Sequence, residues 1–335
     1  MQHINYSIII PHKNSTELLQ YCLNSIPVRD DVQVIVVDDN SDANKVDFIN
    51  FPKWKGKNYE YYLTKEGKGA GYARNVGLEH AKGKWIIFAD ADDHFLPSFD
   101  NILNENLTSN ADITFYRPQA VMLNDHNMRS NRADGYNYLI DETIKTNNTC
   151  LISLMWMSPC SKIIRRDIIN DIKFEEIRYS NDNVFSVTVA CNATKIEVKE
   201  KSFYMITQSD NSLTSNFLQK EGELECRTGA MLRVFYVAKR KGKDISYYLE
   251  TLKSFATKLH RRNWKLYTEY LSCLNDEGIS IMQMIREQYK DKDRLHRWKG
   301  YLNTFFHFYI ERIKFFFANK RIKDSQITLL LLNEI

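Results

Sequence analysis

Three aspartates within four residues are the strongest chemical signal in the chain. Asp90, Asp92 and Asp93 directly follow residues 85–89, a short run of bulky and β-branched residues that is typical of a buried strand. Carboxylates this close repel one another and raise each other's pKa values. A divalent cation relieves that repulsion, and carboxylate oxygens are the ligands that Mg²⁺ and Mn²⁺ prefer. The alternative is a polar turn in which an aspartate caps the next helix.

Polar residues also end two earlier strands. Residues 6–11 and 32–37 are short apolar runs that predict buried strands. The first run ends at Pro11, and the second leads into a second acidic turn, Asp38 and Asp39.

Helical segments separate the predicted strands. Apolar residues recur at helical spacing from Thr16 to Ile26, and a glycine-rich segment over 69–78 opens a second helix after a third strand over 59–63. Strands that alternate with helices of roughly ten residues predict an α/β protein with a mostly parallel sheet. Ligands bind such sheets at the carboxyl ends of the strands. The polar residues that end the strands are therefore expected to share one crevice.

Four ordered segments resemble the signatures of family 2 glycosyltransferases. They are Ser7-Ile8-Ile9-Ile10-Pro11, Val36-Val37-Asp38-Asp39-Asn40-Ser41, Ala73-Arg74-Asn75-Val76-Gly77 and Phe88-Ala89-Asp90-Ala91-Asp92-Asp93. They stand in the family's order and at its spacing, and a looser match continues over residues 156–214. The resemblance implies the Rossmann-like GT-A fold, a nucleotide-diphospho-sugar donor, Mn²⁺ or Mg²⁺, and transfer with inversion.

The resemblance also implies roles at the aspartate cluster. Asp92 would ligate the metal, and Asp90 and Ala91 would lie near the ribose or sugar of the donor. Asp93 would either contact the donor or cap the helix that follows.

Further donor contacts are implied at the earlier motifs. Asp39 resembles the residue that accepts a hydrogen bond from the donor base, whereas Asp38 is either a donor contact or a structural turn residue. Pro11 and His12 are expected beside the base, with no proton transfer assigned to His12.

Residues 65–69 are expected to form a loop that closes over the donor. The glycines around this loop do not have the G-x-G-x-x-G spacing of a dinucleotide fingerprint. Arg74 and Lys68 are candidates to meet phosphate oxygens, although Lys68 could equally be a solvated lysine.

Inverting transfer needs a general base that deprotonates the acceptor hydroxyl. The best candidate is Asp182, which matches the second position of the family's Glu-Asp pair. The first position is Asn181 here, which departs from the family's pattern. The alternative role for Asp182 is a helix N-cap. Trp156 is expected either in the acceptor wall, where it would stack on a sugar, or in the core.

Length and charge indicate two parts. At 335 residues the chain exceeds the size at which one core usually stops growing. Residues 1–215 carry a net charge of −5 and residues 216–335 one of +9. We predict a catalytic domain over 1–215, with a donor half over about 1–117 and an acceptor half over about 118–215. A basic, mainly helical region over 216–335 would follow, with helices at 221–239, 246–265 and 281–289 and a long final segment.

Residues 297–323 combine an aromatic helical face with seven Lys and Arg residues against one acidic residue, Glu311. Such a helix can lie in a membrane interface near anionic lipid, or it can pack against protein. The basic runs carry no recognisable nucleic-acid module, so nucleic acid is not expected as a partner. An oligomer is compatible with the sequence.

The expected location is the cytoplasm. The N-terminus lacks a signal-peptide pattern, and no apolar run reaches the roughly eighteen residues that a membrane span needs. Contact with the inner face of the plasma membrane would depend on residues 297–323. The six cysteines have no C-x-x-C spacing and fit buried free thiols.

These observations predict a metal-dependent inverting glycosyltransferase, of hexosyl- or N-acetylhexosaminyltransferase type. It would move a sugar, most simply from UDP, to a saccharide or lipid-linked saccharide in the synthesis of a bacterial capsule, O-antigen or lipooligosaccharide. One alternative is a sugar-nucleotidyltransferase, which would need a glycine-rich basic loop where this chain has Pro11-His12-Lys13-Asn14. The other is a non-catalytic protein that binds a nucleotide-sugar or a membrane.

Overall fold

The computed structural model describes residues 3–209, 222–259 and 263–278. The chain divides into two compact units, Met1–Ile245 and Ser246–Ile335. This boundary lies beyond the divide near residue 215 that charge suggested, because helix α8 (Glu223–Arg240) packs against α7 (Asn183–Asn192) in the first unit.

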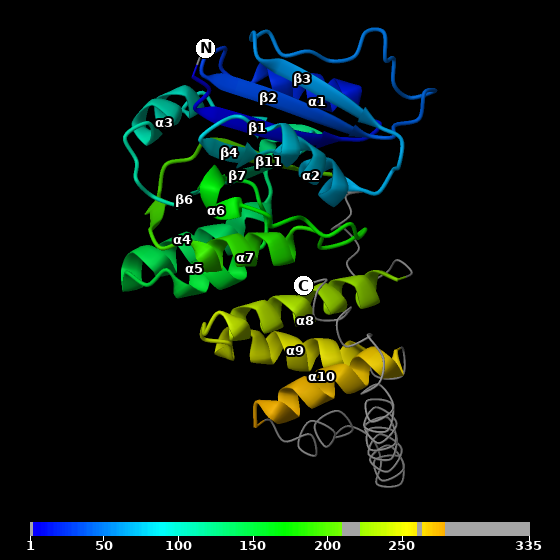
Figure 1. Cartoon of the computed structure of the whole chain (residues 1–335), viewed down its shortest axis with the longest axis vertical. Helices are drawn as coiled ribbons and strands as arrows, with labels where there is room; N and C mark the ends of the chain where they lie inside the picture. The colour runs from blue at the N-terminus through cyan, green and yellow to red at the C-terminus, as the bar shows by residue number, and fades with distance from the viewer. Residues whose placement is uncertain (1–2, 210–221, 260–262, 279–335) are drawn as a thin grey trace. The chain divides into compact units, whose positions relative to one another are not determined.

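A seven-stranded sheet is the centre of the first unit (Figure 1), in the order β10-β6-β9-β4-β1-β2-β3. Strands β4, β1, β2 and β3 are parallel to one another, as β10 is to β6, whereas β9 is antiparallel to both of its neighbours. The predicted mostly parallel sheet is confirmed. Its strands are β1 Tyr6–His12, β2 Val32–Asp39, β3 Tyr59–Thr64, β4 Trp85–Phe88, β6 Ile113–Tyr116, β9 Lys162–Arg165 and β10 Ile196–Lys199.

A second, four-stranded sheet has the order β5-β11-β7-β8. The sequence patterns did not predict this sheet, because β5 has two residues and every residue of β8 is exposed. Its strands are β5 His94–Phe95, β7 Gln119–Met122, β8 Asp125–Arg129 and β11 Tyr204–Gln208. β5 follows the aspartate cluster directly, so the two sheets meet there.

The central strands form because both of their faces are covered. Every residue of β1 and β2 is buried, which explains the nearly continuous apolar runs. Helix α2 (Ala70–His80) packs on both strands. A Cβ atom at Gly77 would lie 2.4 Å from Cγ2 of Ile9, so the close approach of α2 to β1 requires glycine there.

The other helices of the first unit are shorter. α1 follows β1, as the apolar spacing predicts. α5 packs against both α4 and α7 (Figure 1). Their bounds are α1 Thr16–Asn24, α3 Phe99–Asn106, the 3₁₀ helix η1 Asn131–Ala133, α4 Asp134–Thr146, α5 Cys150–Met155 and α6 Arg166–Ile169.

The described part of the second unit is a pair of helices, α9 (Ser246–Leu259) and α10 (Trp264–Asp276), which pack against each other. The prediction of one helix over 246–265 was wrong, because the Asn263 side chain accepts a hydrogen bond from the Leu266 N–H and starts a new helix. The predicted helix over 281–289 and the basic segment 297–323 lie outside the described residues.

The cysteines and the apolar character of the helices were also considered in the sequence. All six cysteines are free thiols. Within the described ranges, no helix has both the length and the apolar character needed to cross a bilayer.

Candidate active site

The aspartate cluster lies at the carboxyl end of β4. Oxygen atoms of Asp90, Asp92 and Asp93 all come within 4.8 Å of one another. Much of the Asp92 side chain is exposed to solvent. Many protein atoms nevertheless surround its carboxylate, and this crowding, followed by the nearby charge of Asp90, raises its pKa to about 6. The structure thus brings the three predicted carboxylates together.

The third carboxylate of the cluster is fully engaged by the second sheet. The Tyr204 hydroxyl donates to Asp93 Oδ2 at 2.7 Å, and the Thr207 N–H donates to Oδ1 at 2.7 Å. Burial, followed by the charges of Asp92 and Asp90, raises the pKa of Asp93 well above its usual range. Its side chain joins the two sheets and caps no helix.

Arg74 connects the aspartate cluster to the residue that precedes Asp182. Its guanidinium is buried, with Nη2 at 2.6 Å from Asp90 Oδ1 and Nη1 at 3.0 Å from Asn181 Oδ1. Its Nε is buried and has no hydrogen-bond partner among the described residues. The structure therefore brings Arg74 and Asp90 together, and it joins them to the segment that carries Asp182.

Asp182 stands at the N-cap position of α7, but its side chain makes no capping hydrogen bond. Burial raises the pKa of its carboxyl, which the charge of Arg74 partly counteracts. A carboxylate with a raised pKa is a better proton acceptor at neutral pH than an ordinary aspartate. The capping role is therefore not seen in the structure, and the role of Asp182 as a base stays a prediction.

The predicted acidic turn, Asp38-Asp39, forms the end of β2 and contains two very different carboxylates. Asp38 is buried, and it accepts hydrogen bonds from His12 Nδ1 (2.7 Å), the Ser41 hydroxyl (2.5 Å) and the Ser41 N–H (2.8 Å). Burial acts to raise its pKa, but these hydrogen bonds outweigh burial and lower it. His12 Nε2 accepts from the Ser15 N–H at 3.0 Å, so both ring nitrogens of His12 are engaged.

Asp39 keeps one oxygen atom unpaired. Its Oδ2 accepts from the Gly69 N–H at 2.9 Å and from Lys13 Nζ at 3.2 Å. Its Oδ1 is buried and has no partner in the described part of the chain. Buried oxygens without partners are rare, and this one can accept a hydrogen bond from a ligand.

The remaining predicted residues differ in their placement. Pro11 is buried in β1 and Ala91 is partly buried against the core. Lys68 Nζ lies 3.3 Å from Glu176 and 4.7 Å from the Tyr72 ring centroid.

Trp156 is a core residue, 1% exposed, and its ring packs against Phe115 and Tyr136. Burial excludes face-on stacking against a sugar in this conformation. Its Nε1 is buried and has no partner among the described residues.

Sequence reasoning missed Tyr204 and Lys162 as contributors to the site. Tyr204 follows no motif, and its role depends on a sheet that the sequence did not reveal. Lys162 is fully buried on β9 and donates to the Trp156 carbonyl oxygen at 3.2 Å. Burial lowers its pKa to about 7. A lysine directly before the two β-branched residues Ile163 and Ile164 is the signal that could have identified it.

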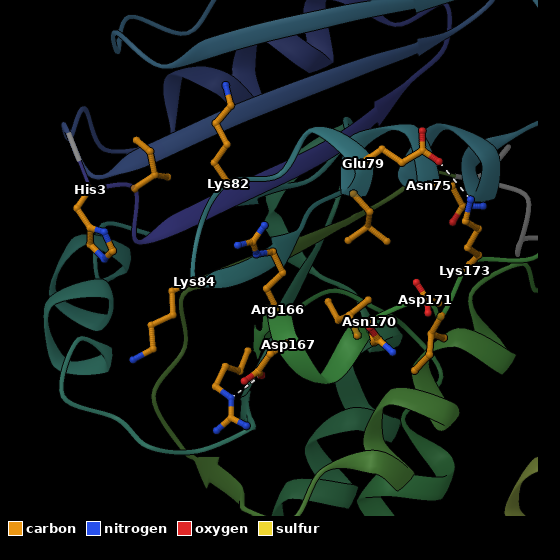
Figure 2. Close-up of a pocket in the computed structure, with 15 residues that line it drawn as sticks. His3, Asn75, Glu79, Lys82, Lys84, Arg166, Asp167, Asn170, Asp171 and Lys173 are labelled. Carbon is orange, nitrogen blue, oxygen red and sulfur yellow. Dashed lines mark hydrogen bonds and ion pairs between the residues drawn. The ribbon is translucent and has the colours of Figure 1, made fainter. Parts of the chain in front are cut away.

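A cleft of about 1000 Å³ lies away from these residues (Figure 2). Its walls include Lys82 and Lys84, just before β4, and Asp167 and Asn170 in and after α6. In such sheets ligands bind at the carboxyl ends of the strands, whereas this cleft lies at the amino end of β4. None of the predicted site residues lines it.

The carboxylates fit a hard divalent cation. Asp92 is exposed and Asp90 has one oxygen that Arg74 does not hold, so both can offer oxygen ligands. Asp93 is less available, because both of its oxygens accept hydrogen bonds from the protein.

Comparison with known proteins supports the architecture. The model of glycosyl transferase family 2 matches residues 7–173. The chain belongs to glycosyl transferase family 2. The predicted family is confirmed, and at this level so is the prediction of a glycosyltransferase.

Relatives of this family 2 protein include enzymes named for transfer to poly(ribitol-phosphate). It is 26% identical over 225 residues to the poly(ribitol-phosphate) β-N-acetylglucosaminyltransferase TarS of Staphylococcus aureus strain MW2. The matched residues cover 64% of this chain and 37% of TarS. It is 25% identical over 306 residues to the uncharacterized glycosyltransferase YibD of Escherichia coli K12, covering 84% and 79% of the two chains. The chain thus spans well under half the length of TarS.

Solved structures confirm the fold. S. aureus TarS residues 1–349 in complex with UDP matches with a TM-score of 0.58 at 19% identity, covering 93% of this chain and 92% of that one. The same TarS fragment with UDP-GlcNAc matches with a TM-score of 0.59 at 18% identity. The predicted α/β GT-A fold is therefore confirmed.

Proposed function

We propose that this family 2 protein is a metal-dependent inverting glycosyltransferase. It moves a sugar from a UDP-sugar to a hydroxyl of a bacterial surface-polymer precursor. The single observation that carries the proposal is the Arg74 bridge, which joins Asp90 to Asn181 and so brings the residue before Asp182 close to the aspartate cluster. A donor bound at the cluster would then lie near a carboxylate that can act as the base, as transfer requires.

The donor base is assigned to the acidic pair at the end of β2. The unpaired Oδ1 of Asp39 can accept the N–H of a uracil ring. Asp38 holds His12 and Ser41 in place behind it. This division of roles makes Asp39 the residue that recognises the base and Asp38 a structural residue.

The diphosphate is assigned to the carboxyl end of β4. Asp92 and the free oxygen of Asp90 would hold Mn²⁺ or Mg²⁺. The cation, when bound, stabilises the charge that develops on the leaving diphosphate. Arg74 holds Asp90 in position and neutralises part of the acidic cluster.

The acceptor hydroxyl is assigned to Asp182. As the glycosidic bond to the diphosphate breaks, the acceptor oxygen attacks the anomeric carbon and its proton passes to the Asp182 carboxylate. Arg74 lies close enough to lower the pKa of this carboxyl, so at neutral pH it favours the ionised form that can take the proton.

The acceptor class rests on the relatives. Two of them are named for transfer to poly(ribitol-phosphate), one of N-acetylglucosamine and one of glucose. We propose a polyol-phosphate or saccharide acceptor of this kind, on a lipid-linked precursor. The reaction would take place in the cytoplasm, where bacterial nucleotide-sugars are found, and residues 297–323 would contact the anionic inner leaflet.

Replacement of Asp92 by Asn tests the proposal. The variant keeps the size of an exposed side chain but removes a ligand, so turnover should fall roughly 100-fold or more. Mn²⁺-dependent UDP binding, measured by calorimetry, should weaken with it. Unchanged Mn²⁺-dependent UDP binding would contradict the metal assignment.

Assays of the reaction products separate the alternatives. A sugar-nucleotidyltransferase would release pyrophosphate from a nucleoside triphosphate and a sugar phosphate. A non-catalytic binding protein would bind UDP-sugars without hydrolysing or transferring them.

A further inference from the structure

Helix α8 lies beyond the family match and contacts the loop of residues 175–181, which immediately precedes Asp182. Cys226 Sγ lies 3.2 Å from the Tyr179 carbonyl oxygen. The Arg227 guanidinium lies over the Tyr179 ring, 5.3 Å from its centroid. One side of the loop is therefore covered by α8.

The strongest contact between α8 and the loop is an ion pair. Both Nε and Nη2 of Arg233 reach the Glu175 carboxylate, the second at 3.2 Å from Oε2. A two-point pair of this kind fixes direction as well as distance. Gly229 is placed one turn before Arg233, and a Cβ atom there would lie 3.2 Å from Arg233 Nη1. The glycine thus leaves room for the guanidinium.

The ion pair acts at the point where the loop closes on itself. The Glu175 N–H donates to the Asn181 carbonyl oxygen at 3.2 Å. The Asn181 side chain in turn accepts from Arg74 at 3.0 Å. A continuous set of contacts therefore runs from Arg233 through Glu175 and Asn181 to the residue next to Asp182.

Helix α2 supports the loop on another side. A Cβ atom at Gly71 would lie 2.2 Å from the Glu175 carbonyl oxygen, so glycine is needed for this contact. The Glu175 backbone is thus seated on α2 while its side chain is held by α8.

We propose that α8 sets the position of the proposed base, with Arg233 and Glu175 as positioning residues. The inference rests on the proposed function only in naming Asp182 as the base. A partly exposed ion pair adds little to global stability, so its main effect is local. Family 2 activity in this chain then depends on a helix that the family model does not include.

Hydrogen exchange tests the placement without any assay of activity. In full-length Arg233→Met protein, the amides of Glu175 and Asn183, which close the loop and begin α7, should exchange at least about tenfold faster than in wild type. The matched control is Arg117→Met, which removes another arginine–carboxylate ion pair, to Asp141. The control should leave these amides unchanged, and the two variants should melt at similar temperatures.

Kinetics tests the consequence for transfer. Arg233→Met should lower kcat roughly 10- to 100-fold with less than a twofold change in donor KM, because a displaced base slows chemistry without altering donor contacts. The exchanged pair Glu175→Arg with Arg233→Glu should recover most of the loss. Glu175→Gln is a second, milder route to the same effect.

The outcomes separate this inference from the proposed function. Equal loop exchange in Arg233→Met, Glu175→Gln and the Arg117→Met control would overturn the role of α8. A kcat equal to that of the control would overturn it as well. If wild type shows no transfer but the exchange arm behaves as expected, the proposed function fails and the placement of the loop by α8 stands.

Discussion

The two acidic turns of this protein look alike in sequence and behave in opposite ways. Asp38-Asp39 ends one buried strand of the sheet, and the Asp90–Asp93 cluster follows another strand that is parallel to it. In the first turn, donors from His12 and Ser41 outweigh burial and lower the pKa of Asp38. In the second, burial and the neighbouring Asp90 raise the pKa of Asp92 to about 6.

The comparison teaches that the hydrogen-bond partners of a carboxylate decide whether it is structural or can bind a ligand. Each turn has one aspartate whose oxygens the protein satisfies, Asp38 and Asp93. Other aspartates keep an oxygen for a ligand: Asp39 in the first turn, and Asp90 and Asp92 in the second. Asp182 belongs with the second group, because it stands at a cap position and makes no capping bond.

The largest expected effect is at Asp182. Asp182→Asn should lower transfer about 10²- to 10⁴-fold, the range for a lost general base, while donor and metal affinity stay nearly constant. Asn181→Ala should cost less, because it removes the side-chain bond to Arg74 but keeps both the Asp182 carboxylate and the backbone bond to Glu175. Transfer within threefold of wild type in Asp182→Asn would make this residue structural, like Asp38.

Within the first turn, Asp39 should matter for the donor. Asp39→Asn places an N–H₂ group where an acceptor is needed, or breaks the bond to Gly69. UDP affinity should weaken about 10- to 100-fold, the scale of a lost charged hydrogen bond. Calorimetric UDP titration measures it, and an unchanged Kd would move base recognition to another residue.

Its neighbour should matter for stability instead. Asp38→Asn removes the charge that accepts from His12 and Ser41, so unfolding should cost about 1–3 kcal/mol less. Denaturant unfolding measures the change. A variant as stable as wild type but weak in UDP binding would reverse the roles assigned within this turn.

The smallest expected effect is a pH dependence at Asp92. Its folded-state pKa of about 6 exceeds the usual value of 3.8, so the folded state binds the extra proton. Stability of the metal-free protein should therefore fall as pH rises from about 4 to 6, and stay lower above it. Melts of wild type and Asp92→Asn across this range should diverge, the variant being the more stable above pH 6. Parallel pH profiles would contradict the assignment.

Sequence reasoning found the parallel core but not the elements that enclose it. The strands β1, β2 and β4 are apolar on both faces, and that pattern is local. β9 enters the sheet antiparallel between β4 and β6, and its neighbours are far away in sequence. The break between α9 and α10 rested on one capping residue, Asn263, inside an otherwise helical pattern.

The site residues likewise divide into those that local motifs reveal and those that only the fold brings together. Motifs located Asp90, Asp92 and Asp182, because each stands at the end of an element that periodicity reveals. The partners that distinguish Asp38 from Asp39 come from separate loops and become visible only in three dimensions. The contact between Arg233 and Glu175 spans 58 residues and leaves no local pattern.

Tyr204 has a consequence for which parts of the second sheet can change without disturbing the acidic cluster. Its hydroxyl donates to Asp93 and accepts from the Asp90 N–H at 2.9 Å, so one phenol on β11 holds both ends of the cluster. This tyrosine reaches the cluster only while β11 keeps its register beside β5. A substitution that shifts β11 is therefore expected to move two of the aspartates at once, whereas β8, whose residues are all exposed, can vary with little effect on them.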